Sequence, residues 1–149
     1  MAATNFAIEA DDGHSVERYD KADLILLGVS RTGKTPTCLY LALTYGLYAA
    51  NYPLTDDELE ACRLPRLLRK NRKKLYGLII APDRLRQIRQ ERSTVGKYSS
   101  KRQVSHEIRL SSALYRELGI PFIDVSESSI EEIASRILNE TGVERRLGR

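Results

Sequence analysis

The fold of this chain is set by the eight residues Gly28-Val29-Ser30-Arg31-Thr32-Gly33-Lys34-Thr35. They follow the pattern G-x-x-x-x-G-K-[ST], in which a glycine-rich loop holds phosphate groups. An apolar run of strand length, residues 22–27, precedes the loop, and a segment suited to a packed helix, residues 36–45, follows it. Strand, glycine loop and helix in this order are the context that the pattern requires. The sequence therefore predicts a P-loop.

Each part of this loop has an expected role in binding a nucleotide or another phosphate compound. Gly28 and Gly33 let the backbone turn and approach an anion without clashes of a Cβ atom. The backbone N–H groups of all eight residues and of the helix N-terminus are expected to point at phosphate oxygens. Lys34 would reach the outer phosphates, and the Thr35 hydroxyl would bind Mg²⁺. Arg31 is a further candidate phosphate contact.

Short apolar runs alternate with helical patterns along the rest of the chain. The strands are expected at residues 48–52, 75–80 and 120–125, and the helices at residues 55–62, 64–74, 82–92, 101–118 and 129–138. This alternation predicts an α/β fold, a P-loop kinase-like parallel sheet with helices on both faces. Right-handed crossovers would place the loop at the carboxyl edge of the sheet. We expect one kinase domain at residues 22–140, a lead-in segment at 1–21 and a basic tail at 141–149.

Four arginines at positions 84, 86, 89 and 92 lie in the predicted helix 82–92. Arginines beyond a glycine loop can clamp a transferring phosphate. For each one alone, however, we favour a solvated helix surface. The polar segment 93–101 is expected to be a loop, and is a candidate for a lid or a partner contact.

Charge and composition restrict the classes of function. Residues 1–62 contain ten Asp and Glu against four Lys and Arg, whereas residues 63–109 contain three against fifteen. The basic middle has little aromatic interleaving and no RNA-binding motif, so nucleic-acid binding is not expected. Cys38 and Cys62 have no metal-ligand spacing, and we expect Cys38 in the core. No apolar run is long enough for a membrane span, so the expectation is a cytoplasmic protein.

Further stretches resemble one protein family. After the loop they are Pro36-Thr37, Leu39-Tyr40-Leu41-Ala42, residues 49–53 and 77–82, Leu85, Ile88-Arg89, Arg92, residues 98–100 and residues 129–132. Together with the loop they resemble the phosphoenolpyruvate synthase regulatory proteins, which are related to the plant pyruvate, phosphate dikinase regulatory proteins. The resemblance covers about residues 5–140.

This resemblance implies a bifunctional enzyme. Family members use ADP, not ATP, to phosphorylate and inactivate a threonine of phosphoenolpyruvate synthase. They also remove that phosphate with inorganic phosphate, which releases diphosphate. The resemblance therefore implies ADP, Mg²⁺ and inorganic phosphate as ligands and phosphoenolpyruvate synthase as the protein partner. The choice of ADP depends on the resemblance alone, because a P-loop pattern does not count phosphates.

The resemblance also implies a catalytic base. A threonine hydroxyl is a poor nucleophile and benefits from a general base. Asp12, with Asp11 beside it, matches an acidic pair that the family carries before the strand of its P-loop. We therefore expect Asp12 to act as this base and Lys34 to stabilise the transferring phosphoryl group. Family members carry a further region before the acidic pair, so the chain is expected to be an N-terminally shortened member.

Two other functions are compatible with the same residues. A small-molecule P-loop kinase would prefer ATP and need no protein target. A shortened, inactive domain would bind a nucleotide or a partner without phosphoryl transfer. A strand-end aspartate usually helps to hold Mg²⁺ in P-loop enzymes, and Asp83 and Asp124 are both candidates, although each also suits the start of a helix. Homo-oligomerisation stays an open alternative.

Overall fold

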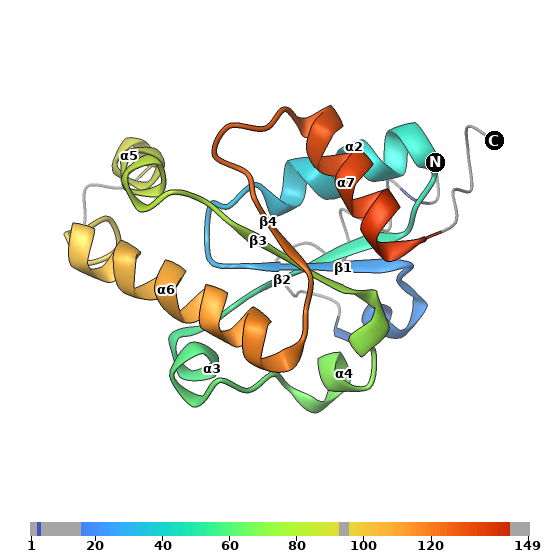
Figure 1. Cartoon of the computed structure of the whole chain (residues 1–149), viewed down its shortest axis with the longest axis horizontal. Helices are drawn as coiled ribbons and strands as arrows, with labels where there is room; N and C mark the ends of the chain where they lie inside the picture. The colour runs from blue at the N-terminus through green and yellow to red at the C-terminus, as the bar shows by residue number, and fades with distance from the viewer. Residues whose placement is uncertain (1–2, 4–15, 93–95, 144–149) are drawn as a thin grey trace.

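The computed structural model describes residues 3, 16–92 and 96–143, and Figure 1 shows their arrangement. In chain order the elements are η2 (Val16–Lys21), β1 (Leu24–Gly28), α2 (Lys34–Tyr45), β2 (Ala49–Pro53), α3 (Asp56–Ala61), α4 (Arg66–Arg69), η3 (Arg72–Lys74), β3 (Leu75–Ile79), α5 (Pro82–Arg92), α6 (Lys101–Leu118), β4 (Phe122–Asp124) and α7 (Ile130–Thr141).

The four strands in the described part of the chain form one parallel sheet in the order β2-β1-β3-β4. Leu26 of β1 is in register with Asn51 of β2 and with Tyr76 of β3. All of β1 is buried, as expected for a strand covered on both faces. The predicted α/β fold with a parallel sheet is therefore confirmed.

Helices cover both faces of the sheet and divide the core into two parts. On one face, Leu24 and Leu26 of β1 pack with apolar residues of α2 and α7. On the other face, Ile25 and Leu27 pack with α3, α4, α5 and α6. Figure 1 shows α2 and α7 on one side of the strands and α3, α4 and α6 on the other. Neighbouring residues of a strand point to opposite faces, so one apolar strand supplies both parts of the core.

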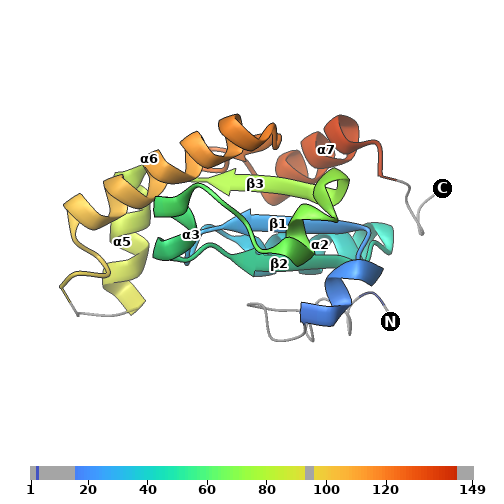
Figure 2. The same ribbon diagram turned by 90° about the horizontal axis from the view of Figure 1, so that it is seen from below.

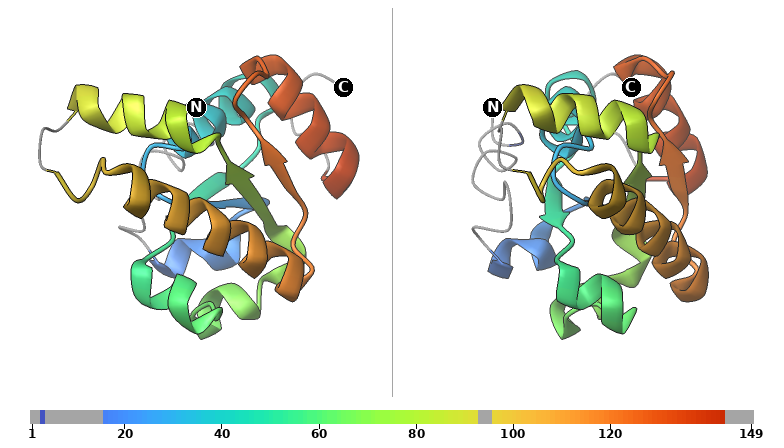
Figure 3. Two further views of the ribbon diagram at one scale, coloured as in Figure 1. Left: turned by 60° about the vertical axis from the view of Figure 1, so that its left-hand side comes forward. Right: turned by 90° about the vertical axis from the view of Figure 1, so that its left-hand side faces the viewer.

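The carboxyl ends of the strands meet at the end of the molecule where α5 lies. The arrows of β1 and β3 point toward that end in Figure 2, and both views in Figure 3 show α5 beyond the tip of β3. Helix α5 packs on α6 there. The loops that follow β1, β3 and β4 are thereby brought together, and this is where parallel sheets place their ligands.

Several local predictions are confirmed by the structure. Helix α6 covers residues 101–118 and ends at Gly119, whose φ is 70°. The predicted helices 55–62 and 129–138 are α3 and α7, and each begins with a capping box, formed by Thr55 with Glu58 and by Ser129 with Glu132. Cys38 is buried. None of the helices in the described ranges is long and apolar enough to cross a membrane.

Three other local predictions differ from the structure. Residues 64–74 do not form a single helix, because Pro65 precedes the short α4 and the side chain of Asn71 bonds the Leu67 carbonyl, so that a separate 3-10 turn, η3, follows. In the segment 36–45, which was predicted to form a packed helix, Leu43 does not pack in the core and is 58% exposed. Its neighbours Leu41 and Ala42 face the sheet instead. The predicted strand 48–52 is shifted by one residue to Ala49–Pro53.

Candidate phosphate-binding site

The glycine loop, residues 28–35, joins the end of β1 to the first turn of α2. Gly28 is the last residue of β1, and Gly33 directly precedes α2 with φ 89°. A Cβ atom on Gly28 would lie 2.5 Å from Oγ1 of Thr32, so a larger residue would force the loop open. Arg31 also has a left-handed φ of 69°, which is strained for a residue other than glycine.

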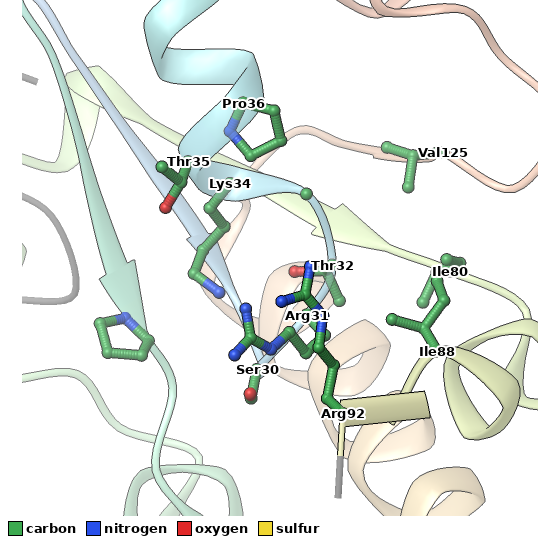
Figure 4. Close-up of a pocket in the computed structure, with 12 residues that line it drawn as sticks. Ser30, Arg31, Thr32, Lys34, Thr35, Pro36, Ile80, Ile88, Arg92 and Val125 are labelled. Atoms are coloured by element: carbon green, nitrogen blue, oxygen red, sulfur yellow. The ribbon is translucent and has the colours of Figure 1, made fainter. Parts of the chain in front are cut away.

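A cavity of about 440 Å³ opens in front of this loop. Residues 30–35 form one wall, and the other lining residues are Pro36, Pro53, Ile80, Ile88, Arg92 and Val125. Pro53, Ile80 and Val125 stand at or directly after the carboxyl ends of three strands. Figure 4 shows the loop curving around the cavity. The sheet thus places this cavity at the carboxyl edge, where the sequence predicted the glycine loop.

The lining of the cavity is strongly cationic. Arg31, Lys34 and Arg92 all line it, and none of its lining residues in the described ranges is Asp or Glu. In Figure 4 the side chains of Arg31 and Arg92 reach toward the same region as the Lys34 ammonium group. Guanidinium and ammonium groups that converge with helix N-terminal backbone suit an anionic ligand such as a phosphate group.

The candidate magnesium ligands do not all lie at the cavity. Thr35 lines the cavity, but Asp83 and Asp124 do not. Oδ1 of Asp124 accepts hydrogen bonds from the backbone N–H and the hydroxyl of Ser126. The described residues contain no group of three or more His, Cys, Asp or Glu side chains that could hold a metal ion. Magnesium binding at Thr35 therefore stays a prediction.

Hydrogen bonds within the loop stabilise its shape. The Val29 carbonyl accepts one from Thr32 Oγ1 and one from Lys34 Nζ, both 2.9 Å long. Lys34 is only 5% exposed, so its ammonium group is kept inside the curve of the loop.

Arg89 of α5 holds the loop from outside the cavity. Its Nε and Nη2 atoms donate to the Ser30 carbonyl at 3.3 and 3.0 Å. Nη1 and Nη2 also donate to the two carboxylate oxygens of Glu107 in α6, at 3.0 and 2.8 Å. Nη1 further donates to the Tyr98 carbonyl at 3.0 Å. Arg89 is 1% exposed, so this guanidinium is a buried charge paired with a buried carboxylate.

Tyr98 adds two contacts between this network and the loop. Its hydroxyl lies 2.7 Å from the Ser30 hydroxyl, and the Arg89 guanidinium lies over its ring at 4.5 Å. Tyr98 belongs to the segment 93–101 that the sequence analysis considered as a lid or a partner contact. In the described part of this segment, Tyr98 is the residue that contacts the glycine loop.

Tyr115 of α6 ties the two central strands together behind the loop. Its hydroxyl donates to the carbonyls of Leu27 in β1 and Leu78 in β3, at 3.2 and 3.1 Å. Burial raises the pKa of Tyr115 far above its usual value. Its ring occupies the space beside Gly77, where a Cβ atom would lie 2.5 Å from the ring.

Of the predicted binding residues, Ser30 to Thr35 line one cavity. Gly28 and Val29 lie at the base of the loop. Asp11 and Asp12 lie outside the described residues. The expectation of a solvated surface is wrong for Arg89. Leu85 precedes Arg89 by four residues and is buried, so the helical period placed Arg89 on the inner face of α5. Glu107 carried the same kind of signal, because it follows the buried Val104 by three residues on the inner face of α6.

Comparisons with known proteins give a consistent result. The model of a family described as kinase/pyrophosphorylase matches residues 1–138. A similar protein from Alcanivorax borkumensis is 52% identical over 97% of the chain. One from Ectopseudomonas mendocina is 55% identical over 99% of the chain. A third, from Psychrobacter cryohalolentis, is 54% identical over 98% of the chain. All three are provisionally named phosphoenolpyruvate synthase regulatory protein. The chain covers 53%, 54% and 52% of their lengths, so it spans about half of the relatives that it matches.

Proposed function

The chain belongs to the kinase/pyrophosphorylase family, and on this basis we propose that it carries the phosphotransferase site of a regulator of phosphoenolpyruvate synthase. In the proposed reaction a threonine hydroxyl of the target attacks the β-phosphorus of ADP, AMP leaves, and phosphothreonine forms. In the second reaction, which removes the modification, an oxygen of inorganic phosphate attacks the phosphothreonine phosphorus. This restores the threonine and releases diphosphate.

The cationic cavity in front of the glycine loop is the observation that supports this proposal. It combines loop backbone at a helix N-terminus with Arg31, Lys34 and Arg92. Transfer of a phosphoryl group needs mainly positioning and charge stabilisation, and this set of groups can provide both. The cavity opens at the carboxyl edge of the sheet, so a protein side chain can approach it from solvent.

The residues have distinct roles in this proposal. The backbone of residues 28–35 cradles the phosphates of ADP, and Lys34 neutralises charge that moves to the bridging oxygen. Arg31 and Arg92 bind the phosphoryl group that is transferred or the incoming inorganic phosphate. Asp12 removes the proton of the threonine hydroxyl. Magnesium would be held by Thr35, where it would neutralise phosphate charge.

Calorimetric titration of ADP and of ATP, each with and without Mg²⁺, tests the nucleotide part of the proposal. We expect ADP to bind the full chain and Lys34→Ala to weaken it at least tenfold, since charge-assisted hydrogen bonds are lost. Arg84→Ala is the matched control, because Arg84 is an exposed cation of α5 that does not line the cavity. A clear preference for ATP would instead support the small-molecule kinase.

Transfer to protein is tested by incubating the chain with phosphoenolpyruvate synthase and ADP and mapping phosphothreonine by mass spectrometry. Asp12→Asn is expected to leave ADP affinity unchanged and to slow transfer by about 10²–10⁴-fold, the usual contribution of a general base. ADP binding without any transfer by the wild-type chain would support the third function, an inactive nucleotide-binding domain.

A further inference from the structure

The buried Arg89–Glu107 pair controls the direction of one peptide group in the glycine loop. The carbonyl of Ser30 receives two of the Arg89 donors, so it points toward α5. The described residues contain no cis peptide, so the N–H of Arg31 points opposite to that carbonyl. Ser30 and Arg31 line the cavity and Arg89 is not among its described lining residues. The Arg31 N–H is therefore directed away from Arg89, on the opposite side of this peptide.

From this geometry we propose that Arg89 is a positioning residue. By fixing the Ser30–Arg31 peptide, it turns a carbonyl away from the bound phosphate and presents an N–H group to it. The inference rests on the proposed function for the identity of the ligand, a nucleoside diphosphate, but requires only that the cavity binds a phosphate group.

The donor groups of Arg89 are fully used in this arrangement. The five donor contacts go to the Ser30 carbonyl, the Tyr98 carbonyl and both oxygens of Glu107. Gln103 Nε2 also donates to Glu107 at 2.9 Å, which orients the carboxylate. Lysine at position 89 would carry the same charge but has no planar fork with which to reach these acceptors together.

The pair also compensates strain in the loop. Arg31 has a left-handed φ, which the surrounding structure must enforce. The Ser30–Arg31 peptide defines that angle, and Arg89 holds this peptide by its carbonyl. Stability alone does not account for the pair, because a buried ion pair can often be replaced by apolar residues without loss of stability. A role in shaping the glycine loop explains why a charged pair is buried between α5 and α6.

The decisive variant is Arg89→Met with Glu107→Leu. It removes both charges together and leaves no unpaired buried ion, so the fold is expected to persist. ADP and sodium diphosphate are the probes, measured by calorimetry, with thermal unfolding recorded for each protein. We expect the double variant to lose about ten- to hundredfold in affinity for both probes, which is the usual weight of a hydrogen bond to a charged group.

The matched control is Ile137→Ala, which opens a cavity in the buried face of α7 and touches neither α5 nor the glycine loop. It is expected to unfold at lower temperature than the wild type yet to keep its affinity for both probes. Loss of affinity in the double variant but not in this control would separate loop positioning from general destabilisation. A folded double variant with affinity within twofold of the wild type would overturn the inference.

A second measurement needs no variant. In ¹H–¹⁵N spectra of the wild-type chain, the Arg31 amide is expected to shift downfield when diphosphate is added, together with the amides of Gly33 and Lys34. If those two amides shift and the Arg31 amide does not, the inference is wrong.

The two probes also separate this inference from the proposed function. A wild type that binds diphosphate but not ADP would contradict the proposed function, and the double variant would still test Arg89 with diphosphate. A wild type that binds neither would overturn both.

Discussion

The two faces of the sheet are built differently. The face under α2 and α7 is closed mainly by aliphatic packing of Leu24, Leu26 and their partners. The face under α5 and α6 also buries the Arg89–Glu107 pair and the Tyr115 hydroxyl, and these polar groups reach the carbonyls of Leu27, Ser30 and Leu78. The first face therefore supports the sheet, whereas the second also determines where the backbone of the glycine loop points.

The strongest test of this difference is removal of one charge from the polar face. Arg89→Ala leaves Glu107 buried without its partner, and we expect it to lower the free energy of unfolding by about 3–5 kcal/mol. The double variant Arg89→Met/Glu107→Leu is expected to be far less destabilised, because no unpaired ion remains. Urea unfolding measures both. Equal destabilisation by the single and the double variant would contradict the importance of the unpaired charge.

The next test compares two arginines of the same helix. Arg92→Ala is expected to weaken binding of inorganic phosphate by about 1.5–3 kcal/mol, or roughly ten- to a hundredfold, since Arg92 lines the cavity. Arg84→Ala should change neither phosphate affinity nor stability beyond about 0.5 kcal/mol. Equilibrium dialysis with labelled phosphate in the presence of saturating ADP measures the difference. Identical behaviour of the two variants would show that Arg92 is only a surface charge.

A third test adds volume to the polar face. A Cβ atom at position 77 would overlap the Tyr115 ring, so Gly77→Ala is expected to cost about 1–3 kcal/mol of stability. The combination of Gly77→Ala with Tyr115→Leu should recover part of that loss, because the smaller side chain vacates the space. Thermal unfolding of the two variants decides this. An unchanged melting temperature in Gly77→Ala would mean that the ring moves without cost.

The smallest expected effect concerns alkaline pH. Burial raises the pKa of Tyr115 in the folded state above its value of about 10 in the unfolded chain. The folded state therefore keeps a proton that the unfolded state loses, and stability falls as the pH rises above about 10, by up to 1.4 kcal/mol per pH unit for this group. Tyr115→Phe should make that decline shallower. An identical slope in urea unfolding between pH 10 and 11 would exclude this contribution.

The sequence predicted the strands and the glycine loop better than the long-range contacts that surround the loop. Apolar runs of strand length and the glycine pattern were enough for the parallel sheet and for a loop at its carboxyl edge, because both signals are local. The far walls of the cavity, Pro53, Ile80 and Val125, come from three separate strands and meet only after folding. The pairing of Arg89 with Glu107 depends on how α5 packs on α6, which no local pattern reports.

The high charge of α5 also led to a wrong prediction for Arg89. Its arginines were expected at the surface because charged side chains are seldom buried without a partner. Arg89 has such a partner, but it lies in another helix, 18 residues away. The only local indication was its position four residues after Leu85 on the buried stripe of the helix.

The hydroxyl of Tyr19 occupies a backbone acceptor of β2, the first strand in the order of the described sheet. Among the described residues β2 is an edge strand of the sheet, and an exposed edge invites pairing with a strand of another molecule. Tyr19 is fully buried beside this strand and donates to the Asn51 carbonyl at 2.7 Å, so one acceptor of the strand is already occupied. The contact that packs η2 against the sheet therefore also leaves β2 with one acceptor fewer for pairing with another strand.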